Sequence, residues 1–197
     1  MELILMRHGT TQGNLEHRFI GVTDLPILPE GEELARKVSP TLPKIERLYV
    51  SPLLRCRQTA ALLWPGMEQT IIPQLRETDF GPFEGKNHEE LKDDPFYQSW
   101  LNAPDFSAVP VGESPEACAV RLAEGLRRVV DDAAERGCER AGVVTHGGSL
   151  MGLMSQFGRP EREYYGWMRP NCGGFRVKVE REPLALTLLE EYGGGKA

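Results

Sequence analysis

Cysteine is scarce in this sequence, which holds 4 cysteines among 197 residues. Cys56, Cys118, Cys138 and Cys172 form no Cys-x-x-Cys pair, so dithiol redox motifs and cysteine-based zinc motifs are absent. We expect reduced and mostly buried thiols, because a free cysteine packs like a small hydrophobic residue. The 4 histidines lack the spacing of an HExxH-type site, and no metal ion is expected.

Long apolar runs are missing as well. No stretch approaches the ~20 apolar residues that a membrane-spanning helix needs. The first apolar stretch, residues 3–6, meets Arg7 at once and is too short for a secretory signal peptide. We therefore expect a cytoplasmic protein without a membrane partner.

An excess of positive charge is also lacking. The chain has 23 Lys and Arg against 29 Asp and Glu, which gives a formal net charge of −6. Such a balance disfavours binding to nucleic acid or to an anionic membrane. It still allows a basic pocket of local extent.

Length and composition favour one ordinary globular domain. The apolar fraction is 40% and the charged fraction is 26%, typical of a folded chain. We expect a single domain over residues 1–192, with an irregular lid at about 80–112 and a flexible tail at 193–197.

Strands and helices are expected to alternate along the chain. The apolar patterns and turn residues predict strands at 2–6, 47–50, 70–72, 141–144, 175–179 and 184–189. Helices are expected at 30–42, 53–63, 115–136 and 148–157, with Ser51 as the cap and Pro52 as the first position of the second one. This alternation predicts an α/β fold whose sheet has mainly parallel strands.

Charged or ionisable side chains follow three of the expected strands. Arg7 and His8 come after the first strand, Ser51 and Arg55 after the second, and His146 after residues 141–144. Ligands of open α/β sheets bind beyond the carboxyl ends of the strands. Guanidinium groups and glycine-rich helix starts both favour anions, so the sequence predicts a phosphate site there.

Four segments then resemble one family in their order along the chain. They are RHGTTQGN at 7–14, SPLLRCRQTA at 51–60, LRETDFGPFEG at 75–85 and VVTHGG at 143–148. Together they are similar to the histidine phosphatase superfamily, also called phosphoglycerate mutase-like. The resemblance covers nearly the whole chain and implies a three-layer α/β/α sandwich and catalysis through phosphohistidine.

The resemblance also assigns roles to residues. His8 matches the family nucleophile, and Arg7, Arg55 and His146 match the pocket residues that stabilise the transferred phosphoryl group. A neutral imidazole can attack phosphorus and so divide one displacement into two. A fixed cation such as Arg7 favours that neutral imidazole and binds phosphate oxygens. The expected substrate-binding set is completed by Asn14, Gly21 and Gly147.

Glu77 matches the family proton donor. Its expected role is to protonate the leaving oxygen and then to activate water. The first step needs a protonated carboxyl group, so we expect an acidic-to-neutral pH optimum. No cofactor is expected, because the nucleophile and the acid are both side chains.

The acidic lid favours hydrolysis over mutase activity. Residues 77–113 contain nine acidic and two basic residues, a formal charge of −7, whereas a mutase must retain a second strongly anionic group. The FGPFEG segment resembles the alpha-ribazole phosphatase branch, which acts in the cobalamin pathway. We therefore expect a metal-independent phosphatase for small phosphomonoesters, with alpha-ribazole phosphate as one candidate substrate.

Alternatives remain at this point. A cofactor-dependent phosphoglycerate mutase and a catalytically silent phosphate-binding module both fit parts of the pattern. The expected partner is a small phosphorylated metabolite, without nucleic acid, and a homodimer is allowed. The lid aromatics are expected to pack on one another, with stacking on a substrate base as the alternative: Phe80, Phe83, Phe96, Tyr97 and Trp100.

Overall fold

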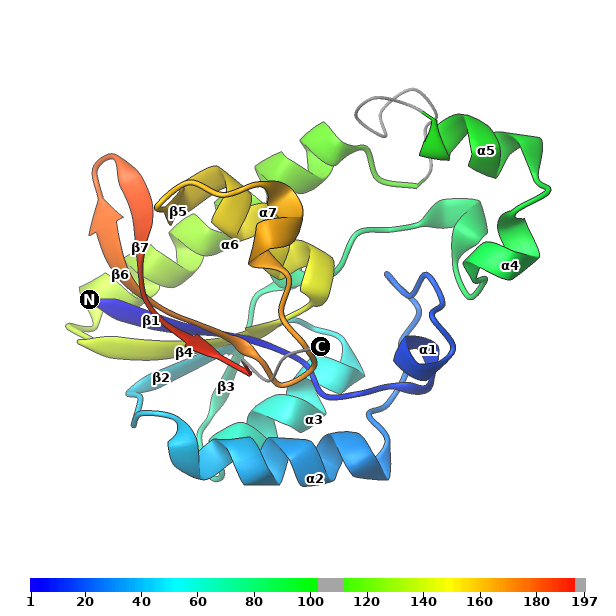
Figure 1. Ribbon diagram of the computed structural model, residues 1–197. Coiled ribbons are helices and arrows are strands. Elements are labelled where there is room, and N and C mark those ends of the chain that lie inside the picture. Colours follow the sequence, from blue (N-terminus) through cyan, green and yellow to red (C-terminus); the bar gives the residue numbers. More distant parts are fainter. Residues whose placement is uncertain (103–111, 194–197) are drawn as a thin grey trace.

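The computed structural model describes residues 1–102 and 112–193 and contains one seven-stranded mixed sheet (Figure 1). The strand order is β3-β2-β4-β1-β6-β7-β5. The strands are β1 (Glu2–Arg7), β2 (Arg47–Val50), β3 (Gln69–Ile71), β4 (Arg140–Thr145), β5 (Gly158–Arg159), β6 (Gly174–Arg181) and β7 (Leu184–Tyr192). Four of the six neighbouring pairs are parallel, and β6 runs antiparallel to β1 and β7. The expected mostly parallel sheet is thus confirmed.

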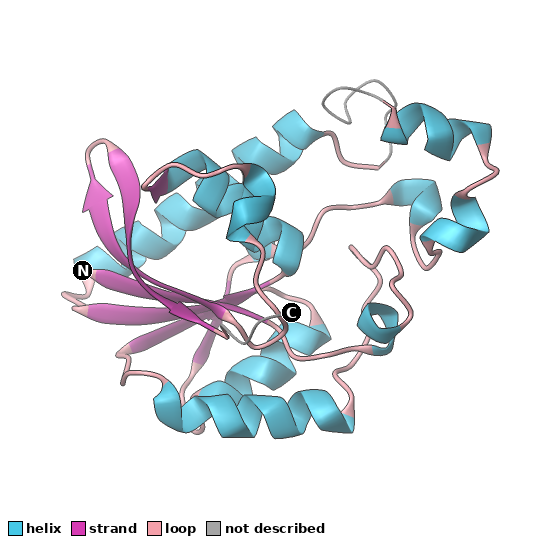
Figure 2. Cartoon of the chain, viewed as in Figure 1, coloured by secondary structure: helices cyan, strands magenta, loops and turns pink. Residues whose placement is uncertain are grey.

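Helices cover both faces of this sheet (Figure 2). They are α1 (Gln12–Leu15), α2 (Pro29–Val38), α3 (Leu54–Leu63), α4 (His88–Leu91), α5 (Pro95–Leu101), α6 (Pro115–Glu135) and α7 (Gly147–Phe157). One hydrophobic cluster joins the sheet to α6 and α7, and a second joins its other face to α2 and α3. The three-layer α/β/α sandwich is confirmed.

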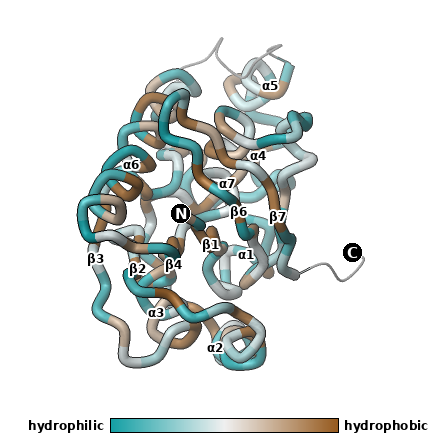
Figure 3. Tube along the Cα trace, turned by 90° about the vertical axis from the view of Figure 1, so that its left-hand side faces the viewer, coloured by the Kyte–Doolittle hydropathy of each residue, from teal (hydrophilic) through white to brown (hydrophobic). Residues whose placement is uncertain are grey.

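The apolar run of β1 follows from burial on both faces. Leu3 and Leu5 belong to the cluster under α6 and α7, whereas Ile4 and Met6 belong to the cluster under α2 and α3. Successive side chains of a strand point to opposite faces, so a central strand covered on both sides has no polar position to alternate with. Figure 3 shows the resulting hydrophobic stretch of β1 in the interior of the molecule.

The start of α3 corrects the sequence expectation. The helix begins at Leu54 with Leu53 as its cap, and neither Ser51 nor Pro52 takes the expected position. The hydroxyl of Ser51 lies instead 2.7 Å from Nε2 of His146. A side chain committed to a tertiary contact does not cap the following helix.

Two small elements were not expected. Helix α1 begins at Gln12, and Thr11 is its N-cap residue. The side chains of Thr11 and Asn14 form a reciprocal capping box. Strand β5 is only two residues long and adds an edge beside β7. Both are too short to leave a periodic pattern in the sequence.

The described part of the lid has a small core of its own. Phe83, Leu91 and Tyr97 are buried together, and Phe19 packs against them from the segment after α1. The ring centroids of Phe19 and Phe80 are 5.3 Å apart. Most of the aromatic side chains of the lid therefore pack on one another, as expected. Residues 103–111 of the expected lid and 194–197 of the expected tail lie outside the described residues.

Two further expectations concern cysteine and the membrane. All four thiols are free, with Cys118 half-buried and the other three buried, as expected. No helix in the described part of the chain combines the length and the apolarity needed to cross a bilayer.

Candidate active site

Strand register brings two distant histidines together. Strands β1 and β4 run parallel with Arg7 opposite Thr145, and the backbone N–H of His8 donates to the Thr145 carbonyl over 3.0 Å. The next residues, His8 and His146, therefore leave the sheet side by side. Their ring centroids are 5.3 Å apart. The parallel strand ends create the site, as the sequence predicts.

The imidazole of His8 is held in one tautomer. Its Nδ1 lies 2.7 Å from the carbonyl oxygen of Gly9, and a carbonyl can only accept, so Nδ1 carries the proton. Burial lowers the pKa of His8 well below its usual value, and the positive charges of Arg55 and Arg7 lower it further. A neutral ring with a lone pair on Nε2 is the form that can act as a nucleophile.

His146 is neutral for a similar reason. Nε of Arg55 donates to its Nδ1 over 3.1 Å, so the ring proton resides on Nε2, which faces Ser51. Burial lowers the pKa of His146 well below its usual value, and Arg55 adds to the effect. Both ring nitrogens have protein partners. The predicted contact of His146 with a phosphoryl group stays a prediction.

Arg55 is a buried cation held by neutral groups. Only 1% of the residue is exposed, and its Nη1 and Nη2 donate to the carbonyls of Thr23 and Gly21 over 2.8 and 2.7 Å. Among the residues that the structure describes, no carboxylate forms an ion pair with it. Carbonyl oxygens orient the guanidinium without cancelling its charge, which remains available to an anion.

Arg7 presents an unused donor. Its Nη1 donates to the Arg169 carbonyl over 2.8 Å, while its buried Nε has no hydrogen-bond partner within the described chain. A buried N–H without a partner carries a large desolvation cost, so this donor is well placed to bind an acceptor such as an anion. The carbon that would be Cβ at Gly147 lies 3.2 Å from this Nε, which places the orphaned donor at the start of α7.

Helix α7 adds a second anion-binding element. It has 11 residues, begins at Gly147 and takes His146 as its N-cap residue. The first N–H groups of a helix and its dipole favour a negative charge at that end. Gly147, predicted to bind substrate, is the first residue of this helix and lies beside the side chain of Arg7.

The carbonyl of Gly21 accepts from Arg55, and Glu84 holds the loop that contains Gly21. The Glu84 carboxylate accepts from the N–H of Gly21 and of Val22, each over 3.0 Å, and from the Thr23 hydroxyl. A Cβ at position 21 would lie 1.8 Å from the carbonyl oxygen of Thr78, so only glycine fits. The N–H and the carbonyl of Gly21 are both engaged, and its predicted contact with substrate stays a prediction.

Asn14 keeps its amide N–H groups available. Its Oδ1 accepts from the Thr11 backbone over 3.0 Å and from Nδ2 of Asn171 over 3.1 Å. Asn171 also donates to the His8 carbonyl over 3.0 Å. These contacts fix Asn14 beside the nucleophile with only its NH₂ left to donate, in agreement with the predicted hydrogen bond to a phosphate.

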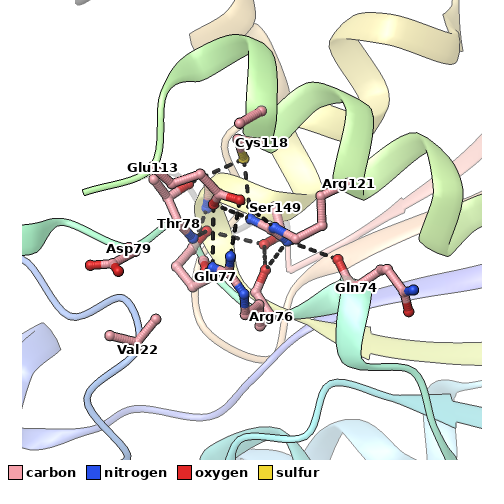
Figure 4. A network of polar contacts seen from close by, with 12 residues as sticks. Val22, Gln74, Arg76, Glu77, Thr78, Asp79, Glu113, Cys118, Arg121 and Ser149 are labelled. Carbon is pink, nitrogen blue, oxygen red and sulfur yellow. Dashed lines mark hydrogen bonds and ion pairs between the residues drawn. The ribbon is translucent and has the colours of Figure 1, made fainter. Parts of the chain in front are cut away.

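The Glu77 carboxylate is held by three donors. Oε2 accepts from the N–H of Gly148 over 2.8 Å, and Oε1 accepts from the Ser149 hydroxyl and the Thr78 N–H, each over 3.0 Å (Figure 4). A Cβ at position 148 would lie 2.8 Å from Oε1 of Glu77, so this glycine permits the close approach. The second half of the predicted site thus sits against the same helix start as the first.

Sequence reasoning missed four supporting residues. Ser51 and Glu84 lie inside the family segments, which marked them without revealing their partners. Asn171 and Ser149 carry no local signal for their contacts with His8 and Glu77, which join residues 163 and 72 positions apart. Only the folded chain reveals these supports.

Comparisons with known proteins agree with this geometry. A family model described as "Histidine phosphatase superfamily (branch 1)" matches residues 3–191. The chain is 31% identical to the adenosylcobalamin/alpha-ribazole phosphatase of Salmonella typhimurium, over 79% of each chain. It is 30% identical to the probable phosphoglycerate mutase GpmB of Enterobacter sp. (strain 638), covering 98% of this chain and 93% of that one. The crystal structure of the alpha-ribazole phosphatase from Shigella flexneri superposes with a TM-score of 0.84 and 25% identity, covering 100% of both chains.

Proposed function

The chain belongs to branch 1 of the histidine phosphatase superfamily, and on that premise we propose that it hydrolyses small phosphomonoesters through a phosphohistidine formed on His8. The superfamily consists of enzymes with phosphatase or mutase activity. We also propose hydrolysis rather than mutase activity, the residue roles given below and a cytoplasmic location.

One observation carries the proposal most directly. A neutral His8 with its lone pair on Nε2 lies close enough to Arg7 and Arg55 for both charges to lower its pKa, and neither arginine is paired with a carboxylate in the described part of the chain. Nε of Arg7 has no hydrogen-bond partner among the described residues, so it can donate to an anion. A phosphoryl group supplies that charge and also supplies the electrophile that His8 needs.

The reaction follows from the placement of these groups. Nε2 of His8 forms a bond to phosphorus while the bond from phosphorus to the ester oxygen breaks, and Glu77 gives its proton to that oxygen. Water then attacks the phosphohistidine, Glu77 takes a proton from it, and phosphate leaves as His8 regains its lone pair. Arg7, Arg55, the Asn14 amide and the start of α7 stabilise the charge on the phosphoryl oxygens.

The lid supports transfer to water. Residues 77–113 carry nine acidic and two basic residues. Lys92 is paired with Glu89 over 2.9 Å, and this pair leaves the net charge of the segment negative. A second phosphate or carboxylate group on the substrate would meet net negative charge here. The relative named as a probable mutase keeps mutase activity as the second candidate.

Alpha-ribazole phosphate is the first substrate to test. One relative and one structural neighbour are named for the phosphatase that acts on it. Under this proposal, the purified protein hydrolyses it faster than simple sugar phosphates. Ready hydrolysis of sugar phosphates with no turnover of alpha-ribazole phosphate would leave the phosphatase class standing and remove this substrate.

The class itself is tested with p-nitrophenyl phosphate in the presence and absence of EDTA. We expect EDTA-resistant hydrolysis by the native chain and its loss in His8→Ala. Acid-labile ³²P on the native chain, absent from the variant, identifies the intermediate. Activity that survives His8→Ala would overturn the mechanism, and phosphoryl transfer from the labelled chain to 3-phosphoglycerate rather than to water would identify a mutase.

A further inference from the structure

A buried ion-pair cluster lies directly behind Glu77. The Glu113 carboxylate, 8% exposed, accepts from Nε of Arg121 over 2.6 Å and from Nη2 of Arg76 over 3.0 Å. The Arg121 side chain is itself only 12% exposed. Burial opposes charge on all of these groups, so such a cluster persists only when its members neutralise one another.

Both arginines of the cluster hold the backbone around Glu77. Nη1 of Arg121 donates to the carbonyls of Gln74 and Arg76, each over 2.8 Å. Nη1 of Arg76 donates to the Glu77 carbonyl over 2.9 Å. Glu113 therefore orients two guanidinium groups toward three carbonyl groups, those of Gln74, Arg76 and Glu77, in the backbone that carries the carboxyl group.

The same backbone connects to the donors of the Glu77 side chain. The Ser149 hydroxyl donates to the Arg76 carbonyl over 2.9 Å as well as to Oε1 of Glu77. Arg121 and Ser149 thus meet on one carbonyl oxygen. Figure 4 shows Glu77 and Ser149 in the same cluster as Arg121 and Glu113, beneath the start of α6.

Charge reaches Glu77 from several elements. Two of the titratable groups that face it, Arg76 and Glu113, belong to the ion-pair cluster itself. The others are Arg7 from β1, Arg55 and Cys56 from α3, Arg121 and Cys118 from α6, and Tyr164 from the turn at 164–167. Burial raises the pKa of both thiols and of the phenol, which stay neutral near neutral pH. A bound phosphate offsets Arg7 and Arg55. Arg121 and Arg76 are the cations that the substrate does not compensate.

Glu113 supplies that compensation. Burial acts to raise the pKa of Glu113, but the hydrogen bond and charge of Arg121 and the charge of Arg76 hold it below its usual value. Burial acts to lower the pKa of Arg121, but the bond to Glu113 raises it. Both partners therefore remain charged over the range in which the enzyme would work.

We propose that Glu113 and Arg121 are positioning residues for the proton donor: they fix the backbone of Glu77, and Glu113 balances the positive charge that lies behind the Glu77 carboxyl group. The inference rests on the proposed function, because it takes Glu77 as the proton donor. It assigns the role to a pair that contributes no atom to the phosphate pocket.

The two partners have opposite electrostatic effects, and this provides the test. Glu113→Gln leaves Arg76 and Arg121 uncompensated, which favours the carboxylate form of Glu77. We follow the pH profile of kcat/KM with glycerol 2-phosphate, a substrate with a poor leaving group. Its alkaline limb should move to lower pH by about half a unit or more. Arg121→Gln removes a cation and should move that limb to higher pH by a similar amount. Arg76→Gln, at a more exposed position, should also move it upward if Arg121→Gln does not fold.

The conservative variant separates charge from orientation. Arg121→Lys keeps the positive charge but cannot donate to Glu113 and to two carbonyls in the same fork geometry. We expect its alkaline limb to stay at the native pH while kcat falls several-fold and KM changes little. A shift of the limb as large as that of Arg121→Gln would contradict the assignment.

The chain offers a matched control at the far end of β1. Glu2 also accepts from two arginines, Arg140 over 2.9 Å and Arg176 over 3.0 Å. Glu2→Gln breaks an ion-pair cluster of the same composition away from the site. It should lower stability without moving the alkaline limb.

A second readout does not depend on turnover. The Glu77 carboxyl resonance of ¹³C-glutamate-labelled protein, assigned by its loss in Glu77→Gln, is followed through a pH titration. Its midpoint should fall in Glu113→Gln and rise in Arg121→Gln. Absence of phosphatase activity with these shifts present would overturn the proposed function alone. Activity with shifts of the same sign in both variants, or no larger than in Glu2→Gln, would overturn the positioning role alone.

Discussion

Nε of Arg55 donates to Nδ1 of His146 over 3.1 Å, and this one hydrogen bond determines which nitrogen of the imidazole carries the proton. A guanidinium has no acceptor to offer, so Nδ1 must be the unprotonated nitrogen. The remaining N–H then points to Ser51 over 2.7 Å. Arg55, His146 and Ser51 form a hydrogen-bonded chain with a fixed direction, which holds the Arg55 side chain in place.

Loss of the Ser51 hydroxyl should weaken the fold. In Ser51→Ala the buried N–H of His146 keeps only the sulfur of Cys56, a weak acceptor 3.4 Å away, and a poorly satisfied buried donor costs about 1–3 kcal/mol. We expect the free energy of unfolding in urea to fall by that amount. Ser155→Ala, an exposed serine of α7, serves as the control and should change it by less than about 0.5 kcal/mol. Equal stabilities of the two variants would show that His146 finds another acceptor.

Stability should decrease as the pH falls below neutral. His8 and His146 are kept uncharged in the folded chain, because their pKa values are lowered well below the usual value by burial and by Arg55. In the unfolded chain both become protonated below about pH 6.5, so unfolding takes up protons and becomes easier as pH drops. The limiting slope is about 2.7 kcal/mol per pH unit for two histidines. Urea unfolding between pH 7 and 5.5 measures it, and His8→Asn should remove about half of the slope.

Replacement of Glu77 should depend on the leaving group. In Glu77→Gln no proton is available for the ester oxygen, and loss of a general acid costs about 10²- to 10⁴-fold in rate. We expect that loss in kcat with glycerol 2-phosphate and a much smaller one with p-nitrophenyl phosphate, whose leaving group needs no proton. Glu89→Gln, an exposed acid of α4, is the control. Equal losses on the two substrates would point to a different role for Glu77.

A single added methyl group should disrupt the proton donor. The Cβ of Gly148→Ala would lie 2.8 Å from Oε1 of Glu77, so the carboxylate must shift from the position in which its three donors hold it. We expect kcat to fall at least about tenfold while circular dichroism stays native, since a misplacement of about 1 Å can cost 10²-fold. Gly152→Ala lies in the same helix and meets only the end of the Leu122 side chain at 2.9 Å. Similar kinetics in the two variants would contradict the steric argument.

Strands and the residues at their ends are the features that local sequence predicts well. The expected strand at 47–50 has the same bounds in the structure, because an apolar run between turn residues specifies a buried strand by itself. His8, Arg55 and His146 follow such strands, and parallel pairing gathers strand ends at one edge. Their meeting is therefore a consequence of the strand pattern.

Side-chain partners over long separations are what the sequence could not reveal. Glu113 reads only as one acidic residue among nine in 77–113, although it is the one that two arginines bury. Ser51 was expected to cap α3 because nothing near it indicates that His146, 95 positions away, takes its hydroxyl. A contact of this kind depends on the assembled layers, which no local propensity encodes.

The position of β1 also determines when the candidate site can first assemble during synthesis. His8 is made before β4 and β6, the strands to which β1 hydrogen-bonds, and these end at Thr145 and Arg181. Asn171, which donates to the His8 carbonyl, is made later still. Gly148 and Ser149, which donate to the Glu77 carboxylate, also follow β4. The imidazole of His8 is therefore made long before the groups that orient it. The candidate site can be complete only after Asn171 has been made, 163 residues after His8, so a translation product that stops before this point lacks part of the site.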